Sequence, residues 1–209
     1  LGGTMRRFKE LFQPLSAAAR EQSCRDALAG RPEPLGNLWI FGYGSLMWDA
    51  PFPHAEVVPV QLLKWHRAMS IWTALARGTP DCPGLSLGLL PGGVCDGVAF
   101  RIAKADQAQA LPIIWEREMW TDTYRPTWVS VDIDGVERSA LTFTTNLDSG
   151  QYAAGLGQDQ IIEHIALAHG ERGPCRDYLT NVVAELDALG ITDRYLTELA
   201  QAVAARPKA

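Results

Sequence analysis

The chain has 209 residues, of which 47% are hydrophobic and 21% are charged, and its formal net charge is -5. This composition is typical of a globular protein. The length suits one domain with an appendage, or two small domains. Its apolar runs are shorter than the ~18 residues of a membrane-spanning helix, and its start lacks a signal-peptide core. The negative net charge argues against a nucleic-acid-binding surface over the whole molecule. Four scattered cysteines predict reduced thiols and a cytoplasmic protein: Cys24, Cys82, Cys95 and Cys175.

Residues 1–35 are predicted to form a helical extension and a linker, preceding a domain at residues 36–205. Residues 5–22 carry helical patches, and the segment from Gly30 to Pro34 is rich in helix breakers. A short apolar run then begins at Leu38 and ends at Gly42, which is typical of a buried strand that enters a tight loop.

Three further segments predict strands. Residues 57–72 contain β-branched and aromatic residues and predict one or two strands. Residues 85–102 predict a hairpin whose turn is the Pro-Gly-Gly sequence at 91–93. Residues 128–145 predict a second hairpin, in which Asp134-Gly135 forms a type I′ turn.

Helices are predicted between the two hairpins and in the last third of the chain. Asp106 is expected to cap a helix that runs to about Trp120 and that Pro112 kinks or divides. Later helices are predicted at residues 159–169, at 176–189 and from Asp193 to about residue 206. Five to seven strands with these helices predict an α+β fold.

Glu118 is the first candidate for a catalytic residue. Leu111, Ile114 or Trp115, and Glu118 follow one helical stripe, so a carboxylate falls where the core face expects an apolar side chain. Burial there raises the pKa of a carboxyl group and suits a general acid or base near neutral pH. Glu116 lies on the opposite face and is expected to be solvated. A salt bridge with an arginine, or exposure at the helix end, also accounts for Glu118.

The second candidate is the glycine loop at residues 42–47, which follows the first strand. Gly42 and Gly44 flank Tyr43, so successive backbone N–H groups can form one concavity that binds a carboxylate or an oxyanion. A tight turn that needs a positive φ explains the same glycines. The third glycine of a dinucleotide fingerprint is missing, and the G-x-S-x-G pattern of a nucleophile elbow is not satisfied around Ser45.

The sequence predicts neither a metal nor a cofactor. His164 and His169 are five residues apart and point to different faces of a helix, so they cannot chelate one ion. Cys95 and Cys175 have no histidine partner at a recognisable spacing, which makes a thiol enzyme the weakest alternative.

An ordered set of motifs between residues 38 and 203 resembles the γ-glutamylcyclotransferases, specifically their ChaC-like, glutathione-directed branch. The set consists of FGYGSLMW at 41–48, KWHR at 64–67, PGL at 83–85, GVAFR at 97–101, REM at 117–119, YRPTWV at 124–129, DYL at 177–179 and LGITD at 189–193. The chain departs from the family pattern between Met119 and Tyr124. There it has Trp120, Asp122 and Thr123 where small residues are usual, which affects the expected substrate preference.

The resemblance implies a small mixed β-barrel with flanking helices and a helical C-terminal segment. It implies a lyase of glutathione catabolism that forms 5-oxoproline and cysteinylglycine, and this chemistry needs no metal. We expect a monomer or weak homo-oligomer with no nucleic-acid or membrane partner. The family's catalytic glutamate falls on Glu118. The substrate-binding positions fall on the loop and on aromatic residues, namely Tyr43, Gly44, Ser45, Leu46, Tyr124 and Tyr152. Two alternatives stay open: a cyclotransferase for other γ-glutamyl amines or γ-glutamyl-amino acids, and a non-catalytic γ-glutamyl-binding module.

Overall fold

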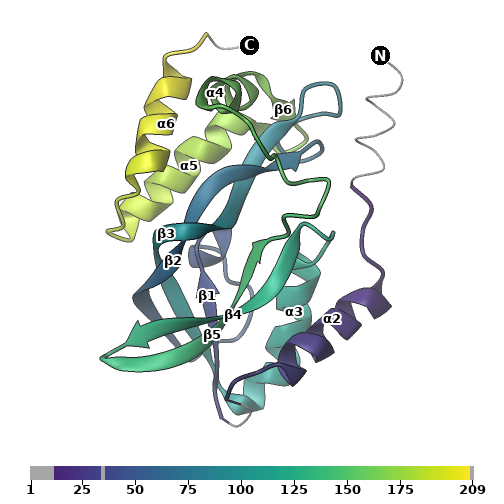
Figure 1. The fold of residues 1–209 in the computed structure, drawn as a ribbon, viewed down its shortest axis with the longest axis vertical. Coiled ribbons are helices and arrows are strands. Elements are labelled where there is room, and N and C mark those ends of the chain that lie inside the picture. Colours follow the sequence, from purple (N-terminus) through teal and green to yellow (C-terminus); the bar gives the residue numbers. More distant parts are fainter. Residues whose placement is uncertain (1–11, 34–35, 208–209) are drawn as a thin grey trace. The chain divides into compact units, whose positions relative to one another are not determined.

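The computed structural model describes residues 12–33 and 36–207, which group into two compact units (Figure 1). Of the described residues, the sheet unit holds 14–33, 36–67 and 89–146, and the helical unit holds 12–13, 68–88 and 147–207. Two of the unit boundaries fall within long strands, β2 (Glu56–Thr73) and β3 (Gly84–Ile102).

A five-stranded mixed sheet with the order β2-β3-β1-β5-β4 confirms the predicted α+β class. The buried strand β1 (Leu38–Gly42) pairs antiparallel with β3 and parallel with β5 (Val136–Thr145), and β5 pairs antiparallel with β4 (Tyr124–Ile133). The sheet curls into a half-barrel. Side chains of both edge strands therefore line one cavity of about 800 Å³, among them Leu63 of β2 and Trp128 of β4.

The predicted hairpin of residues 128–145 is confirmed. Strands β4 and β5 are joined at Asp134 and Gly135, whose φ angles of 55° and 78° are those of a type I′ turn. The side chain of Asp132 supports the turn by accepting a hydrogen bond from the Gly135 N–H at 2.9 Å.

The hairpin predicted at residues 85–102 is wrong, because β3 continues through the Pro-Gly-Gly sequence as one strand. Gly92 and Gly93 have φ angles of 96° and 74° inside that strand, and Lys64 has a φ of 67° inside β2. The ring Nδ1 of His66 lies 2.9 Å from the carbonyl oxygen of Gly92, so the irregular points of the two strands are neighbours. Glycines with positive φ serve a bulge as well as a turn, and here they form a local irregularity in a long strand.

Two helices pack together in the sheet unit (Figure 1). Helix α2 (Ala17–Ala29) begins after Ser16, whose hydroxyl caps it, so it covers only part of the helical region predicted at residues 5–22; residues 1–11 lie outside the described chain. Helix α3 (Gln107–Glu118) follows a 3₁₀ turn, η2 (Lys104–Asp106), and runs unbroken through Pro112. Asp106 occupies the predicted N-cap position, but its side chain forms no capping hydrogen bond.

The helical unit confirms the three predicted C-terminal helices, α4 (Gln158–Leu167), α5 (Cys175–Ala188) and α6 (Arg194–Ala204). They pack against one another, and a two-stranded ribbon of β6 (His169–Gly170) and β7 (Gly173–Pro174) lies between α4 and α5 in the chain (Figure 1). Asp193 caps α6 as predicted, because its carboxylate accepts a hydrogen bond from the Leu196 N–H at 3.0 Å. Buried aliphatic side chains of the three helices, including Ile165, Leu179 and Leu199, form the core of this unit.

Candidate active site

Glu118 is the last residue of α3, and its side chain is only 15% exposed. The helical stripe predicted that Glu118 faces the core, and its low exposure confirms this. The other members of the stripe, Leu111, Ile114 and Trp115, are all buried. Burial raises the pKa of Glu118 to about 7, against an opposing effect of the Arg117 guanidinium. The carboxyl group therefore exchanges a proton near neutral pH, as a general acid or base must.

Arg117 connects the end of α3 to the turn that follows β1. Its Nε lies 3.4 Å from Oε1 of Glu118, and its Nη2 donates a hydrogen bond to Oγ of Ser45 at 2.9 Å. Its Nη1 donates to the carbonyl oxygen of Asp49 at 2.6 Å and forms an ion pair with the Asp49 carboxylate at 3.0 Å. Glu118 is thus both largely buried and in contact with an arginine, which combines two of the interpretations that the sequence left open.

The glycine loop contains a short 3₁₀ turn, η1 (Ser45–Met47), in which Met47 N–H donates to the Gly44 carbonyl oxygen at 2.8 Å. Gly44 has a φ of -137° and Gly42 is not among the glycines with positive φ, so the explanation by a positive-φ turn is wrong. Gly42 is instead closely packed, because a Cβ there would lie 3.1 Å from the ring of Phe100, which is tighter than an ordinary contact. As at any helix start, the first N–H groups of η1 have no acceptor within the turn itself.

The predicted aromatic residues divide between the two units. Tyr43 is buried in the sheet unit, and its hydroxyl donates a hydrogen bond to the carbonyl oxygen of Phe143 at 2.8 Å. Tyr124 is half-buried at the first position of β4. Tyr152 is half-buried in the helical unit, where it forms a β-bridge with Ile71. The structure thus brings Glu118, the glycine loop, Tyr43 and Tyr124 into one unit, and the role of each in substrate binding stays a prediction.

Residues 38–206 match the family model described as ChaC-like protein. The chain belongs to the ChaC-like family. It is 38% identical over 185 residues to the glutathione-specific gamma-glutamylcyclotransferase of Escherichia coli strain K12, covering 88% of this chain and 80% of that protein. Gamma-glutamylcyclotransferase 2-3 of Arabidopsis thaliana is 33% identical and covers 79% of this chain and 88% of its own.

A crystal structure of a yeast γ-glutamyl cyclotransferase specific to glutathione has the same fold. It superposes with a TM-score of 0.70 at 21% identity, over 81% of this chain and 96% of that one. At that identity the likeness establishes the fold alone. The ChaC-like half-barrel and its helices are therefore those that the resemblance implied.

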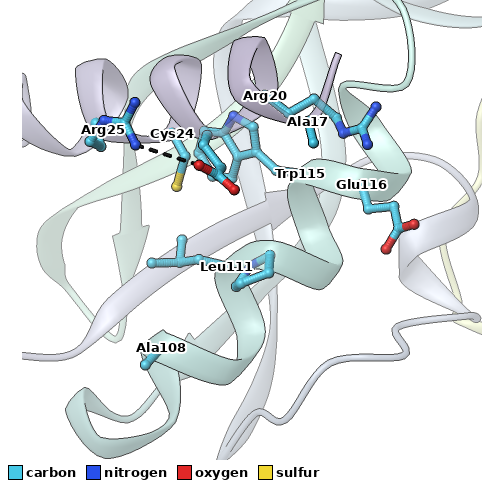
Figure 2. Close-up of a pocket in the computed structure, with 10 residues that line it drawn as sticks. Ala17, Arg20, Cys24, Arg25, Ala108, Leu111, Trp115 and Glu116 are labelled. Atoms are coloured by element: carbon cyan, nitrogen blue, oxygen red, sulfur yellow. Dashed lines mark ion pairs between the residues drawn. The ribbon is translucent and has the colours of Figure 1, made fainter. Parts of the chain in front are cut away.

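A pocket of about 520 Å³ lies between α2 and α3, the helix that carries Glu118 (Figure 2). Its lining includes Cys24 of α2 and Leu111, Trp115 and Glu116 of α3, but not Glu118. Glu116 is exposed there, as the helical pattern predicted. This pocket is therefore distinct from the surroundings of the candidate catalytic carboxylate.

The sequence pattern assigned no role to Arg117 or Asp49, although Arg117 contacts Glu118, Ser45 and Asp49 in the structure. The signals for Arg117 were its position directly before Glu118 and its place in the REM motif at 117–119. Its contacts could not be predicted, since Ser45 and Asp49 are distant from it in sequence. Trp120 and Asp122, where the chain departs from the family pattern, are both exposed, with 44% exposure for Trp120.

The candidate cysteines do not have the properties of a catalytic thiol. All four cysteines are free, and Cys175 is buried, so that desolvation raises its pKa to about 11 and keeps the thiol protonated.

Within residues 12–33 and 36–207, no group of three or more His, Cys, Asp and Glu side chains is arranged to hold a metal. No helix of the described chain is long and apolar enough to cross a membrane.

Proposed function

We propose that this chain is a γ-glutamylcyclotransferase, a lyase that converts glutathione to 5-oxoproline and cysteinylglycine. The observation that carries the proposal is the Glu118 carboxyl group, which is largely buried, has its pKa raised to about 7 and is connected through Arg117 to Ser45 of the glycine loop. The names of the relatives support it, since one is a glutathione-specific gamma-glutamylcyclotransferase that is 38% identical to this chain. The enzyme is expected to act in the cytoplasm as a monomer or weak homo-oligomer.

The substrate supplies its own nucleophile in this reaction. The nitrogen of its α-amine attacks the γ-carbonyl carbon, and the new C–N bond closes a five-membered ring while the bond to the cysteine nitrogen breaks. Glu118 takes the proton that the amine loses and returns it to the leaving nitrogen, so no proton is gained or lost overall. Holding the glutamyl group in a folded conformer supplies much of the acceleration, because well-oriented intramolecular reactions are strongly favoured.

Binding of the γ-glutamyl group is assigned to the glycine loop. Backbone N–H groups of Tyr43, Gly44, Ser45 and Leu46 are proposed to bind its α-carboxylate or to stabilise the oxyanion formed at the γ-carbonyl. Tyr43 and Tyr124, which belong to the same unit as Glu118, are proposed to line the site, and a substrate-binding role for Tyr152 stays a prediction. Such local recognition of an anion is compatible with the net charge of -5 of the whole chain.

Glu118→Gln tests the proposal, because glutamine is nearly isosteric but cannot relay the proton. We expect less than a tenth of wild-type 5-oxoproline formation from glutathione, since general acid–base catalysis contributes about 10²–10⁴-fold. Glu116→Gln is the matched control, because that exposed side chain lies two residues earlier on the same helix and should leave activity unchanged. Retention of more than a tenth of the activity by Glu118→Gln would rule out the relay.

A second candidate keeps the fold and changes the leaving group to another amine or an amino acid. Trp120 and Asp122 motivate it, because both depart from the family pattern directly after the catalytic helix. Quantifying 5-oxoproline from glutathione, γ-glutamyl-alanine and a γ-glutamyl amine separates the two. No product from any of the three donors, together with measurable glutathione binding, would instead indicate a binding module.

A further inference from the structure

The side chain of Arg117 contacts both parts of the proposed site. We propose that Arg117 is a positioning residue that fixes the glycine loop relative to Glu118 and holds a positive charge beside the Glu118 carboxyl group. The inference rests on the proposed cyclotransferase function and adds to it a residue that does not touch the reacting atoms.

The geometry uses the arginine side chain in a way that lysine cannot reproduce. Three nitrogens of one planar guanidinium reach separate partners: Nε reaches Glu118, Nη2 reaches Ser45 and Nη1 reaches Asp49. The Arg117 side chain is only 22% exposed, so water competes weakly for these donors. A guanidinium presents its donors in a rigid fork, whereas the ammonium of lysine is a single flexible point charge.

The glycine loop needs such an anchor, because η1 is a single short turn. A 3₁₀ turn of this length has poor hydrogen-bond geometry and little stability of its own. Ser45 is central here: its N–H is proposed to bind the substrate anion, and its Oγ accepts the bond from Arg117 at 2.9 Å. Arg117 therefore ties the proposed anion-binding groups to the helix that carries Glu118. Catalytic groups must be held within about 0.5 Å of productive geometry, which is the need this contact meets.

The same guanidinium acts on the protonation of Glu118. Within the described chain, the charged group that acts on Glu118 is Arg117, on α3 itself, and Asp49, from the turn beyond η1, pairs with Arg117. Burial of Glu118 favours its neutral form, and the adjacent positive charge favours the carboxylate that must accept the proton. Removal of the charge should therefore raise the pKa of Glu118, so that the variant becomes active only at higher pH.

The test compares kcat/KM for 5-oxoproline formation from glutathione across pH in four variants and the wild type. Arg117→Gln should move the acidic limb of the profile upward by about 1 pH unit or more, as expected when an adjacent opposite charge is lost. Arg117→Lys should keep the limb in place but lower kcat/KM, because it retains charge and loses the fork. Ser45→Ala should lower kcat/KM severalfold without moving the limb. Arg101→Gln, which removes an arginine ion-paired with Glu56 at 2.6 Å, should change neither.

A folded Arg117→Gln protein, verified by circular dichroism, with a wild-type acidic limb would overturn the electrostatic part of the proposal. Wild-type kcat/KM in Arg117→Lys would overturn the positioning part, and this variant decides the matter if Arg117→Gln does not fold. Direct NMR titration of the Glu118 carboxyl group in the wild type and the variants needs no turnover. If the wild type formed no 5-oxoproline, the proposed function would fail. The NMR titration would still test the effect of the Arg117 charge: a higher pKa of Glu118 in Arg117→Gln would support it, and an unchanged pKa would overturn it.

Discussion

The hydroxyl of Tyr43 donates a hydrogen bond of 2.8 Å to the carbonyl oxygen of Phe143, which joins the glycine loop to strand β5 across one hundred positions of sequence. Tyr43 is 8% exposed and Phe143 is 1% exposed, so this bond lies in the core of the sheet unit. The ring of Phe143 also packs edge-on against Trp115, with 5.3 Å between ring centroids. Tyr43 therefore holds the loop to the same core against which α3, the helix that carries Glu118, packs.

Tyr43→Phe should lower the free energy of unfolding by about 1 kcal/mol or somewhat more, because it leaves a buried carbonyl group without its hydroxyl donor. The aromatic ring stays, so the loss of kcat/KM for glutathione should be much smaller than in Glu118→Gln. Urea unfolding followed by circular dichroism measures the first effect, and 5-oxoproline formation measures the second. An unchanged unfolding midpoint would show that the hydrogen bond contributes nothing to stability.

Glu118→Gln should change stability in a pH-dependent manner. The pKa of Glu118 is raised from 4.5 to about 7 in the folded protein, so the folded state holds a proton that the unfolded state releases. The part of the wild-type stability that comes from this bound proton is therefore lost as the pH rises from 4.5 to about 7. Glutamine does not titrate, so the variant does not lose stability in this way. Relative to wild type, the variant should gain about 2–3 kcal/mol between pH 5 and pH 8, since one pKa unit corresponds to about 1.4 kcal/mol.

Denaturant unfolding of both proteins at the two pH values measures this gain. Glu116→Gln serves as the control, because its exposed side chain should give the same difference from wild type at either pH. A constant difference for Glu118→Gln as well would mean that its carboxyl group titrates in the folded protein as it does in the unfolded chain.

Gly97 lies in β3, next to the end of β1 from which the glycine loop starts, and Gly97→Ala should displace that loop. A Cβ at this position would lie 2.5 Å from the carbonyl oxygen of Gly42 and 2.7 Å from the ring of Phe41, so the end of β1 must move. Overpacking of this kind costs about 1–3 kcal/mol, and we expect kcat/KM to fall with it. Thermal unfolding and the 5-oxoproline assay report both effects. In the control Gly30→Ala the nearest atom is 3.7 Å away, and wild-type-like behaviour of both variants would contradict the steric argument.

Local signals account for the parts of the fold that were predicted correctly. The Asp134-Gly135 turn and the Asp193 cap each depend on residues adjacent in the chain, and such signals can be read from sequence. The Pro-Gly-Gly sequence of β3 was misread because positive φ at Gly92 and Gly93 suits a turn and a bulge equally. The neighbouring irregularity at Lys64 of β2, which decides between them, is a tertiary feature.

In the candidate site too, local features were predictable from sequence and tertiary contacts were not. The position of Glu118 followed from the periodicity of one helix, and its largely buried environment agrees with that inference. The contacts of Arg117 with Ser45 and Asp49 join segments that only the folded chain brings together. The reaction itself came from the resemblance to a family, since neither periodicity nor spacing specifies a γ-glutamyl substrate.

Helix α2 precedes the family match and is held to the sheet unit by indole groups. Nε1 of Trp115 donates to Oγ of Ser23 at 3.2 Å, and Nε1 of Trp128 donates to the carbonyl oxygen of Ala27 at 2.8 Å. Trp115 is 2% exposed and lies one turn before Glu118, so α2 covers the helix that carries the candidate catalytic residue (Figure 2). These contacts make α2 part of the packed unit.

Ser23→Ala should therefore lower the free energy of unfolding by about 1 kcal/mol, because the buried indole N–H of Trp115 loses its acceptor. Urea unfolding monitored by tryptophan fluorescence measures this loss. Thr180→Ala is the control: that hydroxyl also forms a hydrogen bond, at 3.0 Å to Arg176, but it is exposed on α5, and its removal should cost less than about 0.5 kcal/mol. Equal, negligible losses in both variants would mean that α2 is held by its apolar contacts alone.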